Sequence, residues 1–171
     1  MDTARTGIDI VEIARMEGIL ARTPRFRERV FTKEERTYCD ASARPATHYA
    51  CRFAAREAVL KCLGCGFSQG VGLTDVSVVH DASGRPRAKL QGRAAEIAAE
   101  QGILEVAISL SFTGSVAIAN AVAVTEAVKP HKDETPNPEA ELAASFKEAR
   151  SIMDELERDE FERVHLQESE E

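Results

Sequence analysis

Apolar and charged side chains alternate near the start of the chain. Over residues 7–13 the alternation involves Ile8, Asp9, Ile10, Val11 and Glu12. Successive side chains of a β-strand point to opposite faces, so this pattern predicts a strand whose end faces a polar site. The apolar spacing becomes helical over residues 14–30, and Pro24 interrupts it because proline removes a backbone donor. We therefore expect one strand followed by two short helices.

Two further helices are predicted from their end signals. Thr32 and Glu35 form a capping-box pattern, in which each side chain accepts a hydrogen bond from the other residue's amide, so a helix should begin at Lys33. A longer helix should begin at Pro45 and end at Gly64, because proline suits the first helical turn and glycine the C-terminal cap. This second helix is mostly apolar and should be buried on more than one side.

The rest of the body has the pattern of hairpins. Residues 73–80 and 86–91 flank a turn in which Gly84 should adopt a positive φ, and a short helix is expected over residues 93–100. Residues 104–113 and 116–124 alternate like two antiparallel, half-buried strands. The last strand has one face of alanines only: Ala117, Ala119, Ala121 and Ala123. Such a face implies that something packs very close to it, either a helix of the same chain or another subunit.

Composition fits one soluble domain with an appendage. The 171 residues are 43% hydrophobic and 30% charged, and no apolar stretch approaches the roughly 20 residues of a membrane-spanning helix. Residues 1–5 carry Asp2 and Arg5 instead of a secretory leader, which favours the cytoplasm. Four cysteines are too few for a disulfide scaffold, so reduced thiols are expected at Cys39, Cys51, Cys62 and Cys65.

The net charge of -7 is unevenly distributed. Residues 1–125 carry a charge of +2 and residues 126–171 a charge of -9. A weakly basic body with few aromatic residues argues against bulk nucleic-acid binding. We expect a domain over residues 1–126, a proline-containing linker over 127–137 and an acidic amphipathic helical tail over 138–171.

The long apolar helix carries Arg52, Glu57 and Lys61. Glu57 and Lys61 are four residues apart, so they could form an exposed ion pair worth a few tenths of a kcal/mol. Charges on a largely buried helix need partners, however, and Asp9 could supply a second carboxylate beside Glu57. Two carboxylates and water would hold Mg²⁺ next to a phosphate, with Lys61 near the developing negative charge. Alternatively, Asp9 is only a polar residue at a strand end.

Other motifs are weaker. Cys62 and Cys65 have the spacing of a redox or zinc pair, but no second pair of ligands has a suitable spacing. The glycines of residues 64–72 follow a helix, whereas phosphate-binding loops usually precede one. A thiol or zinc protein is therefore a distant alternative.

Four segments together resemble the holo-acyl-carrier-protein synthases, which are small 4′-phosphopantetheinyl transferases. They are Gly-Ile-Asp-Ile-Val-Glu-Ile at 7–13, Phe-Thr-Lys-Glu-Glu at 31–35, Arg-Phe-Ala-Ala-Arg-Glu-Ala-Val-Leu-Lys at 52–61 and Gly-Arg-Pro at 84–86. The resemblance spans residues 5–125. It implies an α+β subunit in which an antiparallel sheet packs on a long central helix, here with a C-terminal helical appendage. It also implies a homotrimer with active sites between subunits.

The resemblance further implies the reaction and its residues. The phosphopantetheine arm of coenzyme A would move to a serine of acyl carrier protein, in support of fatty acid biosynthesis, with release of adenosine 3′,5′-bisphosphate. Asp9 and Glu57 match the magnesium ligands, and Lys61 and Arg52 match residues near the coenzyme A phosphates. Gly84, Arg85 and Pro86 match a hairpin near the adenosine, contributed by a neighbouring subunit. The acidic carrier protein would dock on Arg15, Arg22 and Arg25 in a salt-sensitive way.

The chain departs from the family pattern at three positions. Phe112 stands where a histidine usually follows Ser-Leu-Ser, and phenylalanine can neither bind phosphate nor carry a proton. Arg56 replaces the commoner lysine, and Cys51 a glycine. Phe112 leaves open a carrier-protein-binding module without catalysis. The acidic tail lies outside the resemblance, and we hypothesise that it covers the arginines of residues 15–29; the alternative is a solvated appendage.

Overall fold

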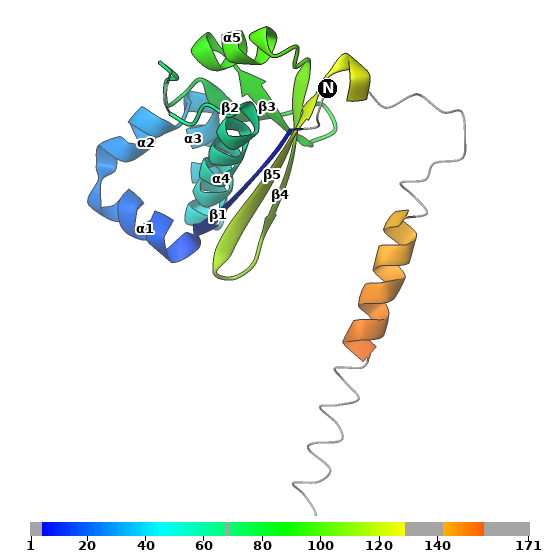
Figure 1. Cartoon of the computed structure of the whole chain (residues 1–171). Coiled ribbons are helices and arrows are strands. Elements are labelled where there is room, and N and C mark those ends of the chain that lie inside the picture. Colours follow the sequence, from blue (N-terminus) through cyan, green and yellow to red (C-terminus); the bar gives the residue numbers. More distant parts are fainter. Residues whose placement is uncertain (1–4, 68, 129–141, 156–171) are drawn as a thin grey trace, which may run out of the picture. The chain divides into compact units, whose positions relative to one another are not determined.

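The computed structural model describes residues 5–67, 69–128 and 142–155. The chain divides into two compact units, Met1–Lys129 and Pro130–Glu171. In chain order the elements of the first unit are β1 (Thr6–Glu12), α1 (Ile13–Arg22), α2 (Pro24–Val30), α3 (Lys33–Asp40), α4 (Pro45–Leu63), β2 (Val76–His80), β3 (Pro86–Leu90), α5 (Gly92–Glu100), β4 (Glu105–Phe112), β5 (Val116–Val124) and the 3₁₀ turn η1 (Glu126–Val128) (Figure 1).

The strands form two antiparallel sheets. One sheet has the order β1-β5-β4, and the other is the β2-β3 hairpin. In the first sheet Asp9 of β1 lies opposite Ala119 of β5, which in turn pairs with Leu110 of β4. Figure 1 shows α4 running along this sheet, with α1, α2 and α3 on its other side. The predicted α+β arrangement around a long central helix is therefore confirmed.

The alanine face of β5 is covered by α4 of the same chain. Ala117, Ala119 and Ala121 are 0% exposed, as are the alanines that α4 turns toward the core: Ala54, Ala55 and Ala58. Small side chains on both elements let the helix lie close to the sheet. Of the two explanations for this face, a helix of the same chain is thus correct, and another subunit is not needed to cover it.

The other face of this sheet is partly open. Ile8 and Ile10 of β1 are 59% and 61% exposed, because Gly7, Asp9 and Val11 are the residues of β1 that alternate toward α4. At the end of β4, Phe112 is 47% exposed although the alternation suggested a half-buried position. A single copy therefore leaves apolar side chains of β1 and β4 in contact with water.

The predicted helix ends are confirmed. The Thr32 amide donates to the Glu35 carboxylate at 2.9 Å, and the Glu35 amide donates to the Thr32 hydroxyl at 3.2 Å, which completes the capping box. Gly64 ends α4 with a φ of 73°, a left-handed conformation that glycine adopts without strain. Elsewhere the boundaries shift by a few residues, since β2 begins at Val76 and α5 at Gly92.

A buried ion pair joins α3, α4 and β2. Arg56 and Glu35 are each 1% exposed, and the Arg56 Nη2 lies 3.1 Å from the Glu35 carboxylate. The Arg56 Nε donates to the Val76 carbonyl at 2.9 Å, and the Val78 amide donates to Glu35 at 3.0 Å. Burial lowers the pKa of Arg56, and the carboxylate of Glu35 opposes this effect. Each charge is buried with a partner, as burial requires.

The second unit contains a helix over residues 142–155, as its apolar spacing predicts. Its large apolar side chains are exposed: Leu142, Phe146, Ile152 and Met153. The predicted linker over 127–137 lies mostly outside the described residues, as do both ends of the predicted tail, so these boundaries stay predictions. Among the described helices, none has the length and apolar character needed to cross a membrane.

Replacing Gly7 with alanine should destabilise the protein. An added Cβ would overlap the Ala58 carbonyl oxygen and would lie 2.7 Å from the Cys62 amide nitrogen, so β1 would have to move away from α4. We expect Gly7→Ala to cost about 1–3 kcal/mol in the free energy of unfolding, measured by urea denaturation. Gly114→Ala is the matched control, since an added Cβ there has no atom within 4 Å. Equal stabilities of the two variants would contradict this packing.

Candidate active site

Asp9 and Lys61 form the centre of the first candidate site. Asp9 points from β1 toward α4, where the Lys61 Nζ lies 2.7 Å from its carboxylate and also donates to the Ile8 carbonyl at 3.1 Å. The Lys61 side chain is 52% exposed, and that of Asp9 is 16% exposed. In the described part of the chain Lys61 pairs with Asp9 and makes no ion pair with Glu57, so the simple i,i+4 pair on the helix is not observed.

Glu57 lies one helical turn before Lys61 and near Asp9. Burial raises the pKa of Glu57, and the Asp9 carboxylate raises it further, while Lys61 and Arg56 act in the opposite direction. Asp9 and Glu57 also line one and the same cavity. The structure therefore brings together Asp9, Glu57 and Lys61, as the sequence predicted.

A cavity of about 600 Å³ opens beside these two carboxylates. Its polar wall includes Asp9, Glu57 and Arg15, and its apolar wall comes mainly from α1, α2 and α4, with Met16, Ile19, Phe26 and Phe53. Sequence reasoning missed this apolar wall, because these side chains also fit the spacing of an ordinary core. The apolar wall can take an apolar arm of a substrate, whereas an anionic end would need a cation between it and the carboxylates.

The donor set of this cavity fits a hard divalent cation. Asp9 and Glu57 offer carboxylate oxygens, the atoms that Mg²⁺ prefers, and Mg²⁺ is usually bound by one or two carboxylates together with water and substrate phosphates. Within residues 5–67, 69–128 and 142–155, no three His, Cys, Asp or Glu side chains are arranged to hold a metal. A cation here would thus depend on the substrate for further ligands.

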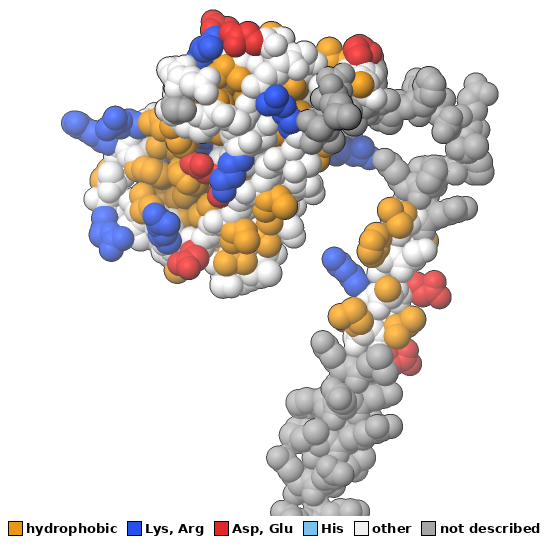
Figure 2. Space-filling model, viewed as in Figure 1, with side chains coloured by type: hydrophobic (Ala, Val, Ile, Leu, Met, Phe, Trp, Pro, Cys, Tyr) orange, Lys and Arg blue, Asp and Glu red, His pale blue; other side chains and the backbone are white. Residues whose placement is uncertain are grey.

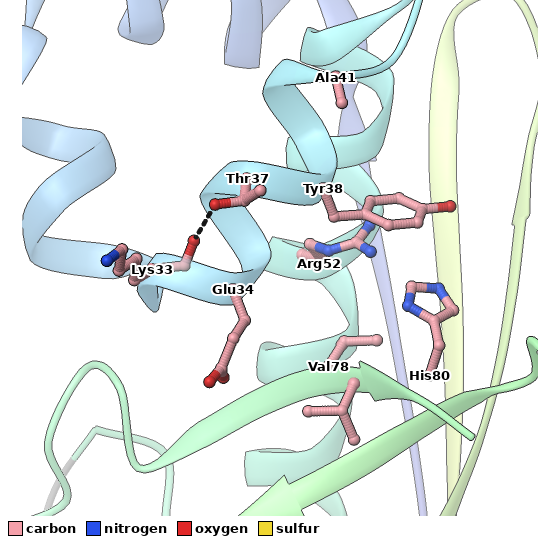
Figure 3. Close-up of a pocket in the computed structure, with 9 residues that line it drawn as sticks. Lys33, Glu34, Thr37, Tyr38, Ala41, Arg52, Val78 and His80 are labelled. Carbon is pink, nitrogen blue, oxygen red and sulfur yellow. Dashed lines mark hydrogen bonds between the residues drawn. The ribbon is translucent and has the colours of Figure 1, made fainter. Parts of the chain in front are cut away.

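Arg52 lies in a second cavity, on another side of α4. This cavity of about 770 Å³ is bounded by α3, α4 and β2, and Figure 3 shows Arg52 and His80 pointing toward Tyr38. The Arg52 guanidinium carbon is 4.0 Å from the centre of the Tyr38 ring, a cation–π contact. His80 stacks on Tyr38 with ring centres 4.5 Å apart. Neither Tyr38 nor His80 belongs to a recognisable motif, so sequence reasoning did not place either residue at a site.

Gly84, Arg85 and Pro86 lie at a third place, the turn between β2 and β3. Gly84 has a φ of 80°, as predicted, and its amide donates to the Asp81 carbonyl at 2.9 Å. The Ser83 hydroxyl and the Arg85 amide donate to the Asp81 carboxylate, which holds the pKa of Asp81 well below its usual range. Arg85 and Pro86 line a cavity of about 340 Å³ together with β4.

The predicted site residues therefore form three separate groups within one copy. No residue that lines the cavity of Asp9 and Glu57 also lines the cavity of Arg52 or that of Arg85. Arg52 and Lys61 are nine residues apart on α4, which is about two and a half turns, so they leave the helix on opposite sides. The three groups therefore line different cavities of one copy.

The predicted docking arginines are exposed on α1 and α2. Arg15, Arg22 and Arg25 all face water. Figure 2 shows Lys and Arg side chains around an apolar area that spans these helices and α4. Exposed cations around an apolar hollow suit an acidic partner with an apolar contact residue.

The remaining motif positions have no catalytic geometry. Phe112 ends β4, and its ring centre lies 6.3 Å from that of His48, so no imidazole stands at position 112 itself. Cys62 and Cys65 are buried, and burial raises the pKa of both thiols. Thiols with raised pKa are poor nucleophiles and poor metal ligands, so this pair does not support a thiol or zinc protein.

Comparison with known families identifies the family to which the chain belongs. The family model described as the 4′-phosphopantetheinyl transferase superfamily matches residues 5–121, which include all three groups above. The chain belongs to the 4′-phosphopantetheinyl transferase superfamily. The resemblance noted in the sequence is thereby confirmed.

Individual members of this superfamily agree. The chain is 45% identical over 118 residues to a holo-[acyl-carrier-protein] synthase of Geobacter metallireducens, which covers 68% of this chain and 94% of that protein. The crystal structure of holo-[acyl-carrier-protein] synthase from Neisseria meningitidis superposes with a TM-score of 0.63 at 32% identity, over 71% of this chain and 98% of that one. The Helicobacter pylori enzyme in complex with coenzyme A gives 0.61 at 28% identity, over 70% and 99%.

Glu57 should make stability depend on pH. Since the folded state raises its pKa above the ordinary value of 4.5, its favourable contribution is fully present below pH 4.5 and is lost as the pH rises through the raised pKa. Glu57→Gln removes the charge. At a pH above the raised pKa of Glu57 we therefore expect this variant to have a higher free energy of unfolding than the unmodified protein, and below pH 4.5 we expect no such gain. The measurement is urea denaturation as a function of pH.

The matched control for this prediction is Glu17→Gln, at an exposed position of α1. We expect its stability to follow that of the unmodified protein at every pH. A Glu57→Gln difference that stays constant with pH would contradict the assignment of a raised pKa to Glu57.

Proposed function

We propose that this protein is a holo-[acyl-carrier-protein] synthase. It transfers the 4′-phosphopantetheine group of coenzyme A to a serine of apo-acyl carrier protein and releases adenosine 3′,5′-bisphosphate. The observation that carries this proposal is the group of Asp9, Glu57 and Lys61 beside a cavity with an apolar wall, in a chain that spans nearly the whole length of relatives with that name. The product would serve fatty acid biosynthesis, and the site of action would be the cytoplasm.

The residues of this cavity can perform the transfer. The serine hydroxyl oxygen forms a bond to the phosphorus that carries the pantetheine arm, and the bond from that phosphorus to the bridging oxygen breaks. The Glu57 carboxylate accepts the serine proton, and the exposed Lys61 ammonium balances the charge that develops on the leaving bisphosphate. Asp9 holds Lys61 in place through their 2.7 Å ion pair.

Magnesium is the cofactor that fits these residues. Asp9 and Glu57 would hold Mg²⁺, which when bound supplies positive charge beside the pyrophosphate.

Phe112 has no group that can take part in proton transfer, so in this mechanism the serine proton passes to Glu57.

The carrier protein would dock on α1 and α2. Exposed Arg15, Arg22 and Arg25 complement an acidic surface, and the apolar wall of the neighbouring cavity can receive an apolar side chain or the pantetheine arm. Contacts between exposed charges are screened by salt, so the Michaelis constant for carrier protein should rise with ionic strength.

A homotrimer would unite the three groups. The open face of the sheet, with exposed Ile8 and Ile10, offers an apolar surface for contact between copies. With such a contact, the Arg85 hairpin of one copy could meet the Lys61 side of α4 in the next. Coenzyme A would then lie between subunits, with its pyrophosphate on one copy and its adenosine on another.

The transfer itself is tested by intact mass. We expect apo-acyl carrier protein to gain one phosphopantetheine group in the presence of this protein, coenzyme A and Mg²⁺, because all substrates are then supplied. Glu57→Ala should reduce the rate by about 100-fold or more, since it removes a carboxylate at the reacting centre. Glu96→Ala, at an exposed position of α5 that lines none of the three cavities, should leave the rate unchanged. Carrier binding without any mass gain would instead favour the non-catalytic binding module.

Mixing two variants tests whether one site is formed by residues of two copies. Glu57→Ala and Arg85→Glu alter different groups, so each should be nearly inactive alone. When the two chains are co-expressed, random pairing in a ring should give about a quarter of the sites an intact Glu57 from one copy and an intact Arg85 from the next. We therefore expect about a quarter of the unmodified rate. A mixture that is no more active than its separate components would overturn the shared site.

A further inference from the structure

The helix of residues 142–155 exposes an apolar face to water. Its large apolar side chains are between 51% and 63% exposed: Leu142, Phe146, Ile152 and Met153. Leu142, Phe146 and Met153 follow one another at intervals of four and seven residues, so they lie along one side of the helix. Figure 2 shows apolar side chains along the surface of this helix. Because a single helix of this length is only marginally stable in water, packing of its apolar face on another surface would stabilise it.

Acidic residues dominate the part of the sequence that contains this helix. Residues 138–171 include twelve Asp or Glu and four Lys or Arg, which is a net charge of -8 with histidine neutral. Three of these acids belong to the described helix: Glu148, Asp154 and Glu155. Like charges repel, so copies of this segment disfavour contact with one another, whereas a basic surface attracts it. The partner that suits this helix is therefore a surface with both arginines and an apolar hollow.

The helices α1 and α2 provide such a surface. Residues 13–30 contain five arginines and two glutamates. Arg27 pairs with Asp40 at 3.2 Å, whereas the other four arginines are exposed and form no ion pair with any described residue: Arg15, Arg22, Arg25 and Arg29. Beside them, the cavity of about 600 Å³ has half-buried apolar side chains in its wall: Ile19, Phe26 and Phe53. Unpaired cations around an apolar hollow complement an acidic helix with an apolar face.

The helix and this surface belong to one chain. Thirteen residues, 129–141, lie in the sequence between the described parts of the two units. Fully extended, thirteen residues span about 45 Å, which is longer than a domain of this size is wide. A linker of this length gives the attached helix a local concentration in the millimolar range, so a contact with a dissociation constant of about 1 mM would already be half occupied. Even a weak contact would therefore be populated.

We propose that the helix of residues 142–155 binds to the surface of α1 and α2 of its own chain, with its apolar face on the cavity wall and its acids beside the exposed arginines. While the helix is bound, this surface is closed to any other acidic partner. The helix thus competes with the carrier protein and lowers the fraction of the protein that can bind it. The competition rests on the proposed function, whereas the binding of the helix does not.

Hydrogen exchange in the full chain is the first test. The double variant Phe146→Gln and Met153→Gln removes two apolar side chains and leaves the charge unchanged. If the helix is bound for roughly half to four-fifths of the time, the amides of residues 13–30 should exchange about two- to fivefold faster in this variant than in the unmodified protein. The matched control is Ala144→Gln with Ser151→Gln, which places the same side chains on the opposite side of the helix. Equal exchange in all three proteins would overturn the proposal.

Steady-state kinetics with carrier protein is the second test. We expect Phe146→Gln with Met153→Gln to lower the Michaelis constant for carrier protein by about the same two- to fivefold, because the docking surface is then free. The values of kcat and of the Michaelis constant for coenzyme A should stay the same, since neither substitution lies in the domain that holds the candidate active site. The control variant should match the unmodified protein. An unchanged Michaelis constant for carrier protein would contradict the competition.

The two experiments separate this inference from the proposed function. Hydrogen exchange needs neither coenzyme A nor carrier protein. If the exchange of residues 13–30 differs as expected while no carrier protein is modified, the proposed function fails and the binding of the helix stands. If carrier protein is modified while the exchange is the same in all three proteins, the proposed function stands and the binding of the helix fails.

Discussion

The close approach of α4 to the three-stranded sheet is the constraint on which the structure depends. It requires small residues on both elements, which is why alanines line β5 and α4 and why a glycine stands at position 7. With β1 this near the helix, the Asp9 carboxylate reaches Lys61 and comes close to Glu57. The geometry of the candidate active site is therefore a direct product of backbone packing. A larger side chain in the interface would separate the carboxylates before it disturbed either of them chemically.

The remaining functional groups lie on the other side of α4. Arg52 and the residues around it share a cavity with α3 and β2, and the Arg85 hairpin borders β4. Coenzyme A has well-separated anionic groups, and the candidate groups of one copy line separate cavities. The homotrimer proposed above would give the protein a larger binding surface than one copy offers. The exposed apolar residues of β1 are consistent with contact between copies.

Much of this structure could be predicted from local sequence signals. The capping box at Thr32, the proline at the start of α4 and the glycine at its end set helix boundaries through hydrogen bonds within a few residues, so they are readable without the fold. The motif residues Asp9, Glu57 and Lys61 were also predicted to meet. What could not be predicted depends on contacts between distant segments. Tyr38, His48 and His80 come from α3, α4 and β2, and only folding brings their rings together.

The buried pair of Arg56 and Glu35 has a consequence for the orientation of α4. Arg56 precedes Glu57, and neighbouring side chains on a helix diverge by about 100°. By holding Arg56 against α3 and β2, the ion pair fixes the rotation of α4 about its own axis. The direction of the Glu57 carboxylate is thereby determined by a contact on another side of the helix. The planar guanidinium lets Arg56 donate to the Val76 carbonyl and to Glu35 at the same time. These two contacts prevent α4 from rotating about its own axis.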